Sequence, residues 1–153
     1  MTIEYRRGDL FAQHDITAYA HGCNCRGVMG AGIAAQFRAR YPLMYRTYRS
    51  ACRGGLLTLG MVMPWQAADG KMIYNLMTQD QPGPDARPWA ITTAAGQMIQ
   101  LARLCRVRTI GLPMIGCGIG GLNPEDLDRC LQPFATAPVR LVVVEYAPAE
   151  ARS

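Results

Sequence analysis

Residues 20–36 have the residue types and the spacing to bind an anion. The segment ends an apolar strand, passes through a loop rich in glycine and runs directly into a helical pattern. Loop amides and the free N–H groups of a helix's first turn point at one spot, where the helix dipole favours negative charge. Glycine suits such a loop because a phosphate can approach the backbone only where no Cβ atom intervenes. The segment therefore predicts a site for a phosphate or pyrophosphate.

A second glycine-rich segment, residues 115–122, repeats this arrangement. It follows the apolar residues 109–113, which we expect to form a buried strand, and it precedes a helix that begins at Asn123 and Pro124. Asn is a preferred N-cap, and Pro suits the first position of a helix. In open α/β sheets, ligands bind beyond the carboxyl ends of the strands. Because both loops follow strands, we expect them to share one cleft.

The elements that must position these loops can be read along the chain. Apolar alternation predicts strands at 2–6, 16–20, 57–65, 71–78, 109–113 and 139–146. Helices are expected at 31–40, from Pro42 to the glycines at 54–55, at 89–105, and from Pro124. The Asp69-Gly70 turn predicts a hairpin between the strands at 57–65 and 71–78. Mixed strands and helices imply a three-layer α/β/α domain around a mixed central sheet. We expect a single domain over 1–148, with a short C-terminal tail at 149–153.

The composition excludes several classes of protein. Of the 153 residues, 50% are hydrophobic and 18% are charged, which is typical of a globular domain rather than a disordered chain. No apolar run is long enough to span a membrane, and no signal peptide opens the chain. The six cysteines form no C-x-x-C pair, so we expect reduced cytosolic thiols, no disulfide framework and no metal site. These features favour a cytoplasmic protein without membrane contact or cofactor, and they leave the oligomeric state open.

The net charge of +5 comes almost wholly from arginine, since Lys71 is the only lysine. The arginines concentrate at positions 38–53 and 103–108. On helices they could form a basic face for nucleic acid, including RNA. A solvated helix surface is the simpler interpretation, and we favour it at this point.

The glycine loop also matches part of a dinucleotide-binding fingerprint. Residues 30–35 fit G-x-G-x-x-A, a pattern of nicotinamide dehydrogenases. That fingerprint follows the strand directly and requires an acidic residue about 20 positions further on. Here a long turn separates the strand from the glycines, and residues 49–56 hold no acid. A dehydrogenase is therefore not favoured.

The order of these motifs resembles the macrodomain family, over roughly residues 2–146. The similarity rests on Gly8-Asp9-Leu10, Ala20-His21-Gly22-Cys23-Asn24, Gly30-Ala31-Gly32-Ile33-Ala34 and Pro113-x-Ile115-Gly116-Cys117-Gly118-x-Gly120-Gly121. Within the family, the segment from His21 and the later Arg40-Tyr41-Pro42 look most similar to the ADP-ribose 1''-phosphate phosphatases. Terminal ADP-ribose protein glycohydrolases and DNA ADP-ribosyl glycohydrolase antitoxins are similar too. The resemblance implies a cleft for ADP-ribose over the sheet.

The resemblance also implies roles for individual residues. Asp9 would accept a hydrogen bond from the adenine amino group, and Leu10 would offer its backbone N–H. Asn24 would hold the distal ribose, with Gln79 beside it. The backbone around the diphosphate would come from two loops, Gly30, Ala31, Gly32 and Ile33 in the first and Ile115, Gly116, Cys117, Gly118, Ile119, Gly120 and Gly121 in the second. From the residues alone, Asp9 could equally cap a turn and Asn24 could be a satisfied loop residue.

The catalytic residues implied by the resemblance are only partly present. A lysine after the hairpin strand and an aspartate in the second glycine loop act in the glycohydrolases, but here Gln79 and Gly120 take those positions. Glutamine carries no charge and cannot form a Schiff base, and Lys71 lies at the opposite end of the strand. His21 and Asn24 are then the candidates for catalysis, although His21 could equally be a buried histidine that supports the loop.

Other side chains near the cleft are weaker candidates. Asp80 and Asp85 could position water, and Arg87 could neutralise a phosphate. Cys117 is expected to be a passive small residue rather than a nucleophile, because no base is assigned near it.

Two functions follow from these residues. One is hydrolysis of an ADP-ribose derivative, in which the bond could be a 1''-phosphate, an acyl ester, or an ADP-ribosyl linkage to protein or nucleic acid. The alternative is a reader module that binds ADP-ribose without turnover, which Gln79 and Gly120 favour.

Overall fold

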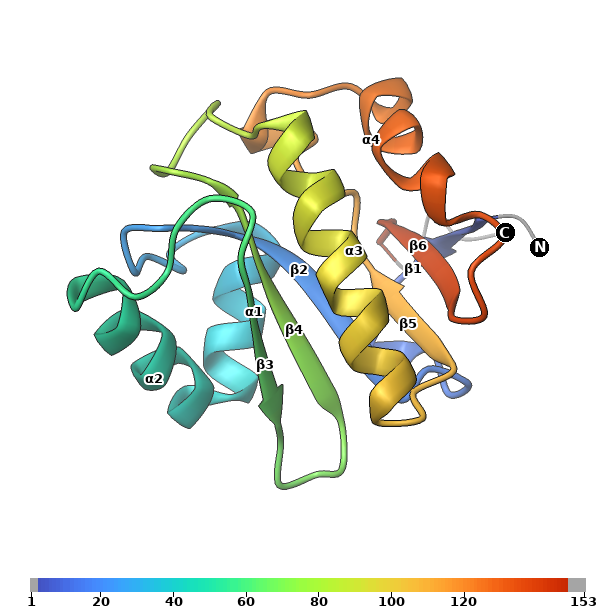
Figure 1. Cartoon of the computed structure of the whole chain (residues 1–153), viewed down its shortest axis with the longest axis horizontal. Coiled ribbons are helices and arrows are strands. Elements are labelled where there is room, and N and C mark those ends of the chain that lie inside the picture. Colours follow the sequence, from blue (N-terminus) through green and yellow to red (C-terminus); the bar gives the residue numbers. More distant parts are fainter. Residues whose placement is uncertain (1–2, 149–153) are drawn as a thin grey trace.

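The computed structural model describes residues 3–148, which form a single six-stranded sheet with helices on both faces. Helices α1 and α2 cover one face, and α3 and α4 cover the other (Figure 1). The strands are β1 (Glu4–Gly8), β2 (Ala18–Asn24), β3 (Val62–Gln66), β4 (Met72–Gln79), β5 (Thr109–Leu112) and β6 (Arg140–Tyr146). The helices are α1 (Gly32–Arg40), α2 (Pro42–Arg53), α3 (Pro88–Leu104) and α4 (Pro124–Leu131). The predicted three-layer α/β/α architecture is confirmed, and the predicted tail at 149–153 lies outside the described residues.

The sheet is mixed, with strand order β1-β6-β5-β2-β4-β3. All neighbouring pairs are parallel except β3 and β4, which form the antiparallel hairpin that the Asp69-Gly70 turn predicts. The carboxyl ends of β2, β4 and β5 therefore meet at one edge, and the two glycine loops leave from that edge. In open α/β sheets, ligands bind at the carboxyl ends of the strands.

The core consists of two apolar clusters, one on each face of the sheet. Residues of β2 contribute in turn to the two clusters, because successive side chains of a strand point to opposite faces of the sheet. Ala18 and Ala20 pack toward α3, whereas Tyr19 and Cys23 pack toward α1 and α2. Phe37 of α1 is fully buried in the second cluster and lies between the rings of Phe11 and His21, at centroid distances of 4.9 Å and 4.0 Å.

Three strands differ from the sequence prediction by more than one residue. β1 was expected over 2–6 but is Glu4–Gly8, because its pairing with β6 continues to Gly8. β2 was expected over 16–20, but it continues to Asn24, because it pairs residue by residue with β4 as far as Asn24 and Gln79, with an irregularity after Cys23. β3 was expected from residue 57 but begins at Val62. Before it, the chain turns at Gly60, where φ is +87° and the N–H donates to the Met77 carbonyl at 2.9 Å. The predicted first strand includes Thr2, which lies outside the described residues.

The packing of α1 generates a prediction of stability. Phe37→Ala would remove a fully buried ring from the α1 side of the sheet, so we expect it to lower the unfolding free energy by about 3–5 kcal/mol in urea titration. Leu104→Ala, at a side chain that is 82% exposed, is the control and should change it by less than about 0.5 kcal/mol. Similar values for the two variants would contradict this account of the core.

Candidate functional site

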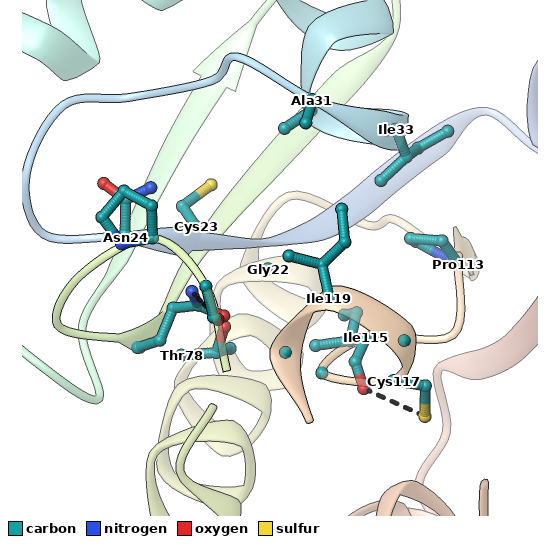
Figure 2. Close-up of a pocket in the computed structure, with 18 of the residues that line it drawn as sticks. Gly22, Cys23, Asn24, Ala31, Ile33, Thr78, Pro113, Ile115, Cys117 and Ile119 are labelled. Carbon is teal, nitrogen blue, oxygen red and sulfur yellow. Dashed lines mark hydrogen bonds between the residues drawn. The ribbon is translucent and has the colours of Figure 1, made fainter. Parts of the chain in front are cut away.

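A cavity of about 460 Å³ opens at the edge where β2, β4 and β5 end. Its walls are the residues that follow these strands, together with the first turn of α1. Figure 2 shows Ala31 and Ile33 on one side, Ile115 and Ile119 on the other, and Asn24 and Pro113 at opposite ends. Both predicted glycine loops therefore line one cavity.

The first loop is organised by the side chain of Asn24. Its Oδ1 accepts from the backbone N–H groups of Arg26 at 2.9 Å and Val28 at 3.3 Å, and its Nδ2 donates to the Val28 carbonyl at 2.8 Å. The hydroxyl of Tyr48 donates to the Asn24 backbone carbonyl at 2.6 Å. Asn24 is 8% exposed, yet it lines the cavity. It is a satisfied loop residue that also forms part of the site wall.

Helix α1 begins at the cavity with an N-terminus that no side chain caps. Gly32, the first helical residue, has φ of +58°, a conformation that favours glycine. Gly32, Ile33 and Ala34 all line the cavity. The unpaired N–H groups of this first turn and the helix dipole are suited to an anion.

The second loop uses positive φ at Gly116, Gly118 and Gly121, with values of +79°, +68° and +89°. It closes on itself through bonds from Leu122 N to the Gly116 carbonyl at 2.9 Å and from Gly121 N to the Gly118 carbonyl at 3.0 Å. A Cβ atom at Gly116 would lie 2.9 Å from the Leu122 side chain, whereas one at Gly118 would meet no atom within 4 Å. Gly116 is therefore needed for packing, and Gly118 leaves its backbone open to a ligand.

The two loops approach each other over the cavity. Ile119 is 62% exposed, and a Cβ atom at Gly32 would lie 3.9 Å from its Cδ1 atom. The apolar side chain of Ile119 thus covers part of the cavity between the loops.

A second cavity, of about 720 Å³, continues the first toward β1 and β6. Asp9 and Leu10 line it, as the sequence predicts, together with Glu145 and Tyr146. Six residues line both cavities, so the two form one continuous cleft: Gly32, Ile33, Pro113, Met114, Cys117 and Gly118. Asp9 also caps a short 3₁₀ helix, because its Oδ1 accepts from Phe11 N at 2.9 Å.

Gln79 lies at the opposite end of the cleft from Asp9, in the cavity wall where β4 ends. Its Nε2 donates to the carbonyls of Gln81 at 2.7 Å and Gly83 at 3.0 Å. These bonds tie the side chain to the proline-rich loop after β4. A Cβ atom at Gly120 would lie 3.5 Å from its Oε1, so this oxygen is directed toward the second glycine loop.

The charged residues of the proline-rich loop hold that loop together. Asp85 Oδ2 accepts from the backbone N–H groups of Asp80 and Gln81 at 2.9 and 3.1 Å, and Oδ1 accepts from Arg87 at 3.0 Å. The backbone bond from Gln81 is the main cause that lowers the pKa of Asp85. Asp80 pairs with Arg26 of the first loop at 3.0 Å. Asp80, Asp85 and Arg87 line neither cavity, so their placement does not favour contact with a ligand.

His21 lies beneath the cleft rather than in it. The side chain is fully buried, stacks on Phe37, and lines neither cavity. Its Nε2 lies 2.6 Å from Oδ1 of Asn75, whose Nδ2 donates to the Met63 carbonyl at 3.0 Å. This network assigns a hydrogen to His21 Nε2, with Asn75 Oδ1 accepting. Burial lowers the pKa of His21 to about 4. The geometry therefore argues against the predicted catalytic role and for the supporting one.

The surroundings of Cys117 do not activate its thiol, as the sequence predicts. Its Sγ lies 3.8 Å from the Ile115 carbonyl (Figure 2). Burial is the main cause that raises the pKa of the thiol, so it is not activated as a nucleophile.

The structure brings together every predicted ligand-binding residue except Gly121, which adjoins the lining of the first cavity but is not part of it. Sequence reasoning missed several wall residues, including Thr78, Pro82 and Gly83 at the end of β4, and Gln36 and Tyr146 near Asp9. Their position could have indicated them, because each lies at or after the carboxyl end of a strand or faces the cleft from α1. Among residues 3–148, no group of three or more His, Cys, Asp or Glu side chains could hold a metal ion. The same residues include no helix long and apolar enough to cross a membrane.

Comparison with known proteins places this architecture in a family. The sequence model of the Macro domain matches residues 20–131. The chain belongs to the macrodomain family. This confirms the resemblance that the loop motifs indicated.

Two groups of curated relatives are similar to this macrodomain. The DNA ADP-ribosyl glycohydrolase of Mycobacterium tuberculosis is 36% identical over 132 residues, covering 84% of this chain and 37% of that protein. The ADP-ribose 1''-phosphate phosphatase of Scheffersomyces stipitis is 28% identical, covering 86% of this chain and 94% of that protein. The chain thus spans little more than a third of the glycohydrolase it matches.

A solved structure shows the same fold. The macrodomain of Mycobacterium tuberculosis DarG has a TM-score of 0.80 and 32% identity, with 97% of this chain and 99% of that chain covered.

The surroundings of His21 generate a prediction for pH. Nitrogen NMR should show a neutral imidazole with hydrogen on Nε2 from pH 8 down to about 5, protonated only near its lowered pKa of about 4. The unfolded chain protonates this histidine near pH 6.5, so its contribution to stability should be complete above that pH and fall as the pH drops toward 4. A titration midpoint at or above 6.5 would contradict the buried, neutral state.

Proposed function

We propose that this macrodomain binds ADP-ribose and hydrolyses an ADP-ribose derivative, either ADP-ribose 1''-phosphate or an ADP-ribosyl linkage on nucleic acid or protein. The observation that carries the proposal is the continuous cleft. A carboxylate lies at one end, two glycine loops and an uncapped helix N-terminus lie at the middle, and the amides of Asn24 and Gln79 lie at the other end. The order of these groups matches the order of adenine, diphosphate and distal ribose in the ligand.

In this proposal, Asp9 would recognise the adenine. One carboxylate oxygen, Oδ1, caps the 3₁₀ helix, and no other described residue bonds to Oδ2. This oxygen can accept from an exocyclic amino group of a base. Leu10 N–H and the ring of Tyr146, which is 66% exposed, border the same cavity.

The negative charge of the diphosphate would be stabilised by backbone N–H groups rather than by cationic side chains. No Lys, Arg or His is among the described residues that line the first cavity. The N–H groups of the first turn of α1 and of the loop around Gly118 would bind the phosphate oxygens instead. Such fixed dipoles need no reorganisation when the ligand binds, which is the basis of electrostatic stabilisation in active sites.

Hydrolysis at the distal ribose would depend on positioning. Asn24 and Gln79 border the distal end, and both side chains are already fixed by hydrogen bonds to their own loops. They can orient the ribose and a water molecule without the cost of ordering free side chains. The names of the relatives, DNA ADP-ribosyl glycohydrolase and ADP-ribose 1''-phosphate phosphatase, support these two substrate classes.

A reader module is the second candidate function, and one observation favours it. Apart from the thiols of Cys23 and Cys117, the described lining of the first cavity holds no ionisable side chain. Burial raises the pKa of both thiols, so neither supplies a general base. A first cavity without an acid or base suits binding without turnover as well as it suits hydrolysis by positioning.

Binding is tested by calorimetry with ADP-ribose on the Asp9→Ala variant. We expect affinity to fall by about ten- to a hundredfold, because a hydrogen bond to a charged group is worth about 1.5–3 kcal/mol. Asp69→Ala is a matched control: Asp69 also accepts a backbone N–H bond, from Lys71 at 2.9 Å, but lines neither cavity. Equal affinities for the wild type and the Asp9 variant would overturn the assignment of the adenine end.

Turnover is tested by single-turnover assay of the full chain. ADP-ribose 1''-phosphate, ADP-ribosylated DNA and ADP-ribosylated protein are each mixed with excess protein. We expect release of ADP-ribose from at least one of them. If all three remain intact while calorimetry shows binding of ADP-ribose, the reader function replaces hydrolysis.

A further inference from the structure

The α1–α2 face of the molecule has an unbalanced positive charge. From residue 16 to residue 68 the chain contains six arginines and no acidic residue. Five of these arginines lie on α1 and α2, at positions 38, 40, 46, 49 and 53, and all five are exposed.

Five arginines outside α1 and α2 are neutralised by a neighbour. Arg6, Arg26, Arg87, Arg129 and Arg140 each form an ion pair with a carboxylate. By contrast, Arg38, Arg46 and Arg49 form no ion pair with any described residue. Their guanidinium groups are therefore available to pair with an anionic partner.

Three of the unpaired arginines line one groove between α1 and α2. The arginine groove has a volume of about 580 Å³, and it is lined by Ala35, Arg38, Ala39, Pro42, Tyr45, Arg46 and Arg49. The guanidinium of Arg38 lies over the ring of Tyr45, 4.2 Å from its centroid. Stacking of this kind restrains the side chain before any partner arrives. The groove is therefore a concave, partly ordered cationic surface.

The arginine groove adjoins the distal end of the cleft. Helix α2 supports the first loop through the hydroxyls of Tyr48, which donates to the Asn24 carbonyl at 2.6 Å, and Tyr45, which donates to the Gly27 carbonyl at 3.4 Å. A Cβ atom at Gly27 would lie 3.3 Å from Cα of Arg49. The loop that Asn24 organises therefore lies between the distal end of the cleft and Arg49.

We propose that the arginine groove binds the phosphodiester backbone of single-stranded DNA and holds the strand whose ADP-ribosyl group enters the cleft. The second part of this proposal rests on the proposed function. Arginine is suited to phosphate because its planar donors match the oxygens in pairs. A single strand is favoured over a duplex because a nucleotide must leave its base stack before an attached ribose can enter a cleft. The length of α2, about 18 Å for its twelve residues, suits a few phosphates of one strand.

The groove is tested by fluorescence anisotropy of the full chain with an unmodified, labelled single-stranded DNA of twelve nucleotides. The test variant is Arg38→Gln/Arg46→Gln/Arg49→Gln. We expect it to lose at least about tenfold in affinity at low salt, and its slope of log K against log salt to fall by about 2, since each single-strand phosphate contact contributes about 0.7.

A matched control removes three charges from the other end of the sheet. Arg103, Arg106 and Arg108 are exposed and form no ion pair with any residue from 3 to 148. They lie from the last turn of α3 to the residue before β5. The control variant is Arg103→Gln/Arg106→Asn/Arg108→Gln, with Asn chosen because Arg106 has φ of +58°. It should keep wild-type affinity for the DNA. An equal loss in this variant would show that net charge, rather than the groove, governs binding, and it would overturn the proposal.

Further measurements distinguish a single DNA strand from other occupants of the groove, and they distinguish this proposal from the proposed function. Tighter binding to duplex DNA than to the single strand, or full competition by polyglutamate, would overturn the choice of a single DNA strand as the occupant. Calorimetry with free ADP-ribose should give the same affinity for the groove variant and the wild type. If the wild type does not bind ADP-ribose, only the proposed function is refuted. DNA binding by the groove is measured without ADP-ribose and is tested separately.

Discussion

An anion can be bound by backbone alone only if N–H groups converge and no Cβ atom stands between them and the ligand. In this macrodomain that requirement is met twice at one edge of a parallel sheet. Gly32 begins α1 at a positive φ, and Gly116 and Gly118 curve the loop after β5. The sheet order brings the ends of β2 and β5 side by side, so the two arcs face each other. The other features of the cleft are arranged around this pair.

The residues that buttress the cleft are as specific as the glycines. Asn24 uses both ends of its amide on the first loop, and Tyr48 fixes it from α2. Gln79 and Asp85 do the same for the loop after β4. Polar side chains at the rim are thus used mainly to shape the backbone, and the backbone is left to meet the ligand. This division explains how a site for a charged ligand can lack cationic side chains in its described lining.

Much of the fold and most of the cleft could be predicted from the sequence, because glycine loops between strands and helices are local signals. The boundaries of β2 could not, since its extension to Asn24 depends on pairing with β4, about 50 residues away. That one error concealed the orientation of His21. In a strand that continues past residue 20, side-chain alternation places His21 on the same face as Tyr19 and Cys23 and against Phe37, where it lines neither cavity. The sequence left open whether Asn24 is a satisfied loop residue, because its bonds to Arg26 and Val28 depend on the three-dimensional path of the loop.

The neutral character of the first cavity has a consequence for how the protein responds to acidification. Its described lining holds no group that changes charge between pH 6 and 8, since burial raises the pKa of both cavity thiols and the nearby histidine is uncharged throughout that range. The proposed binding of a diphosphate by this part of the cleft would therefore be insensitive to the proton concentration of its surroundings. A change from pH 8 to pH 6 would leave it unaltered.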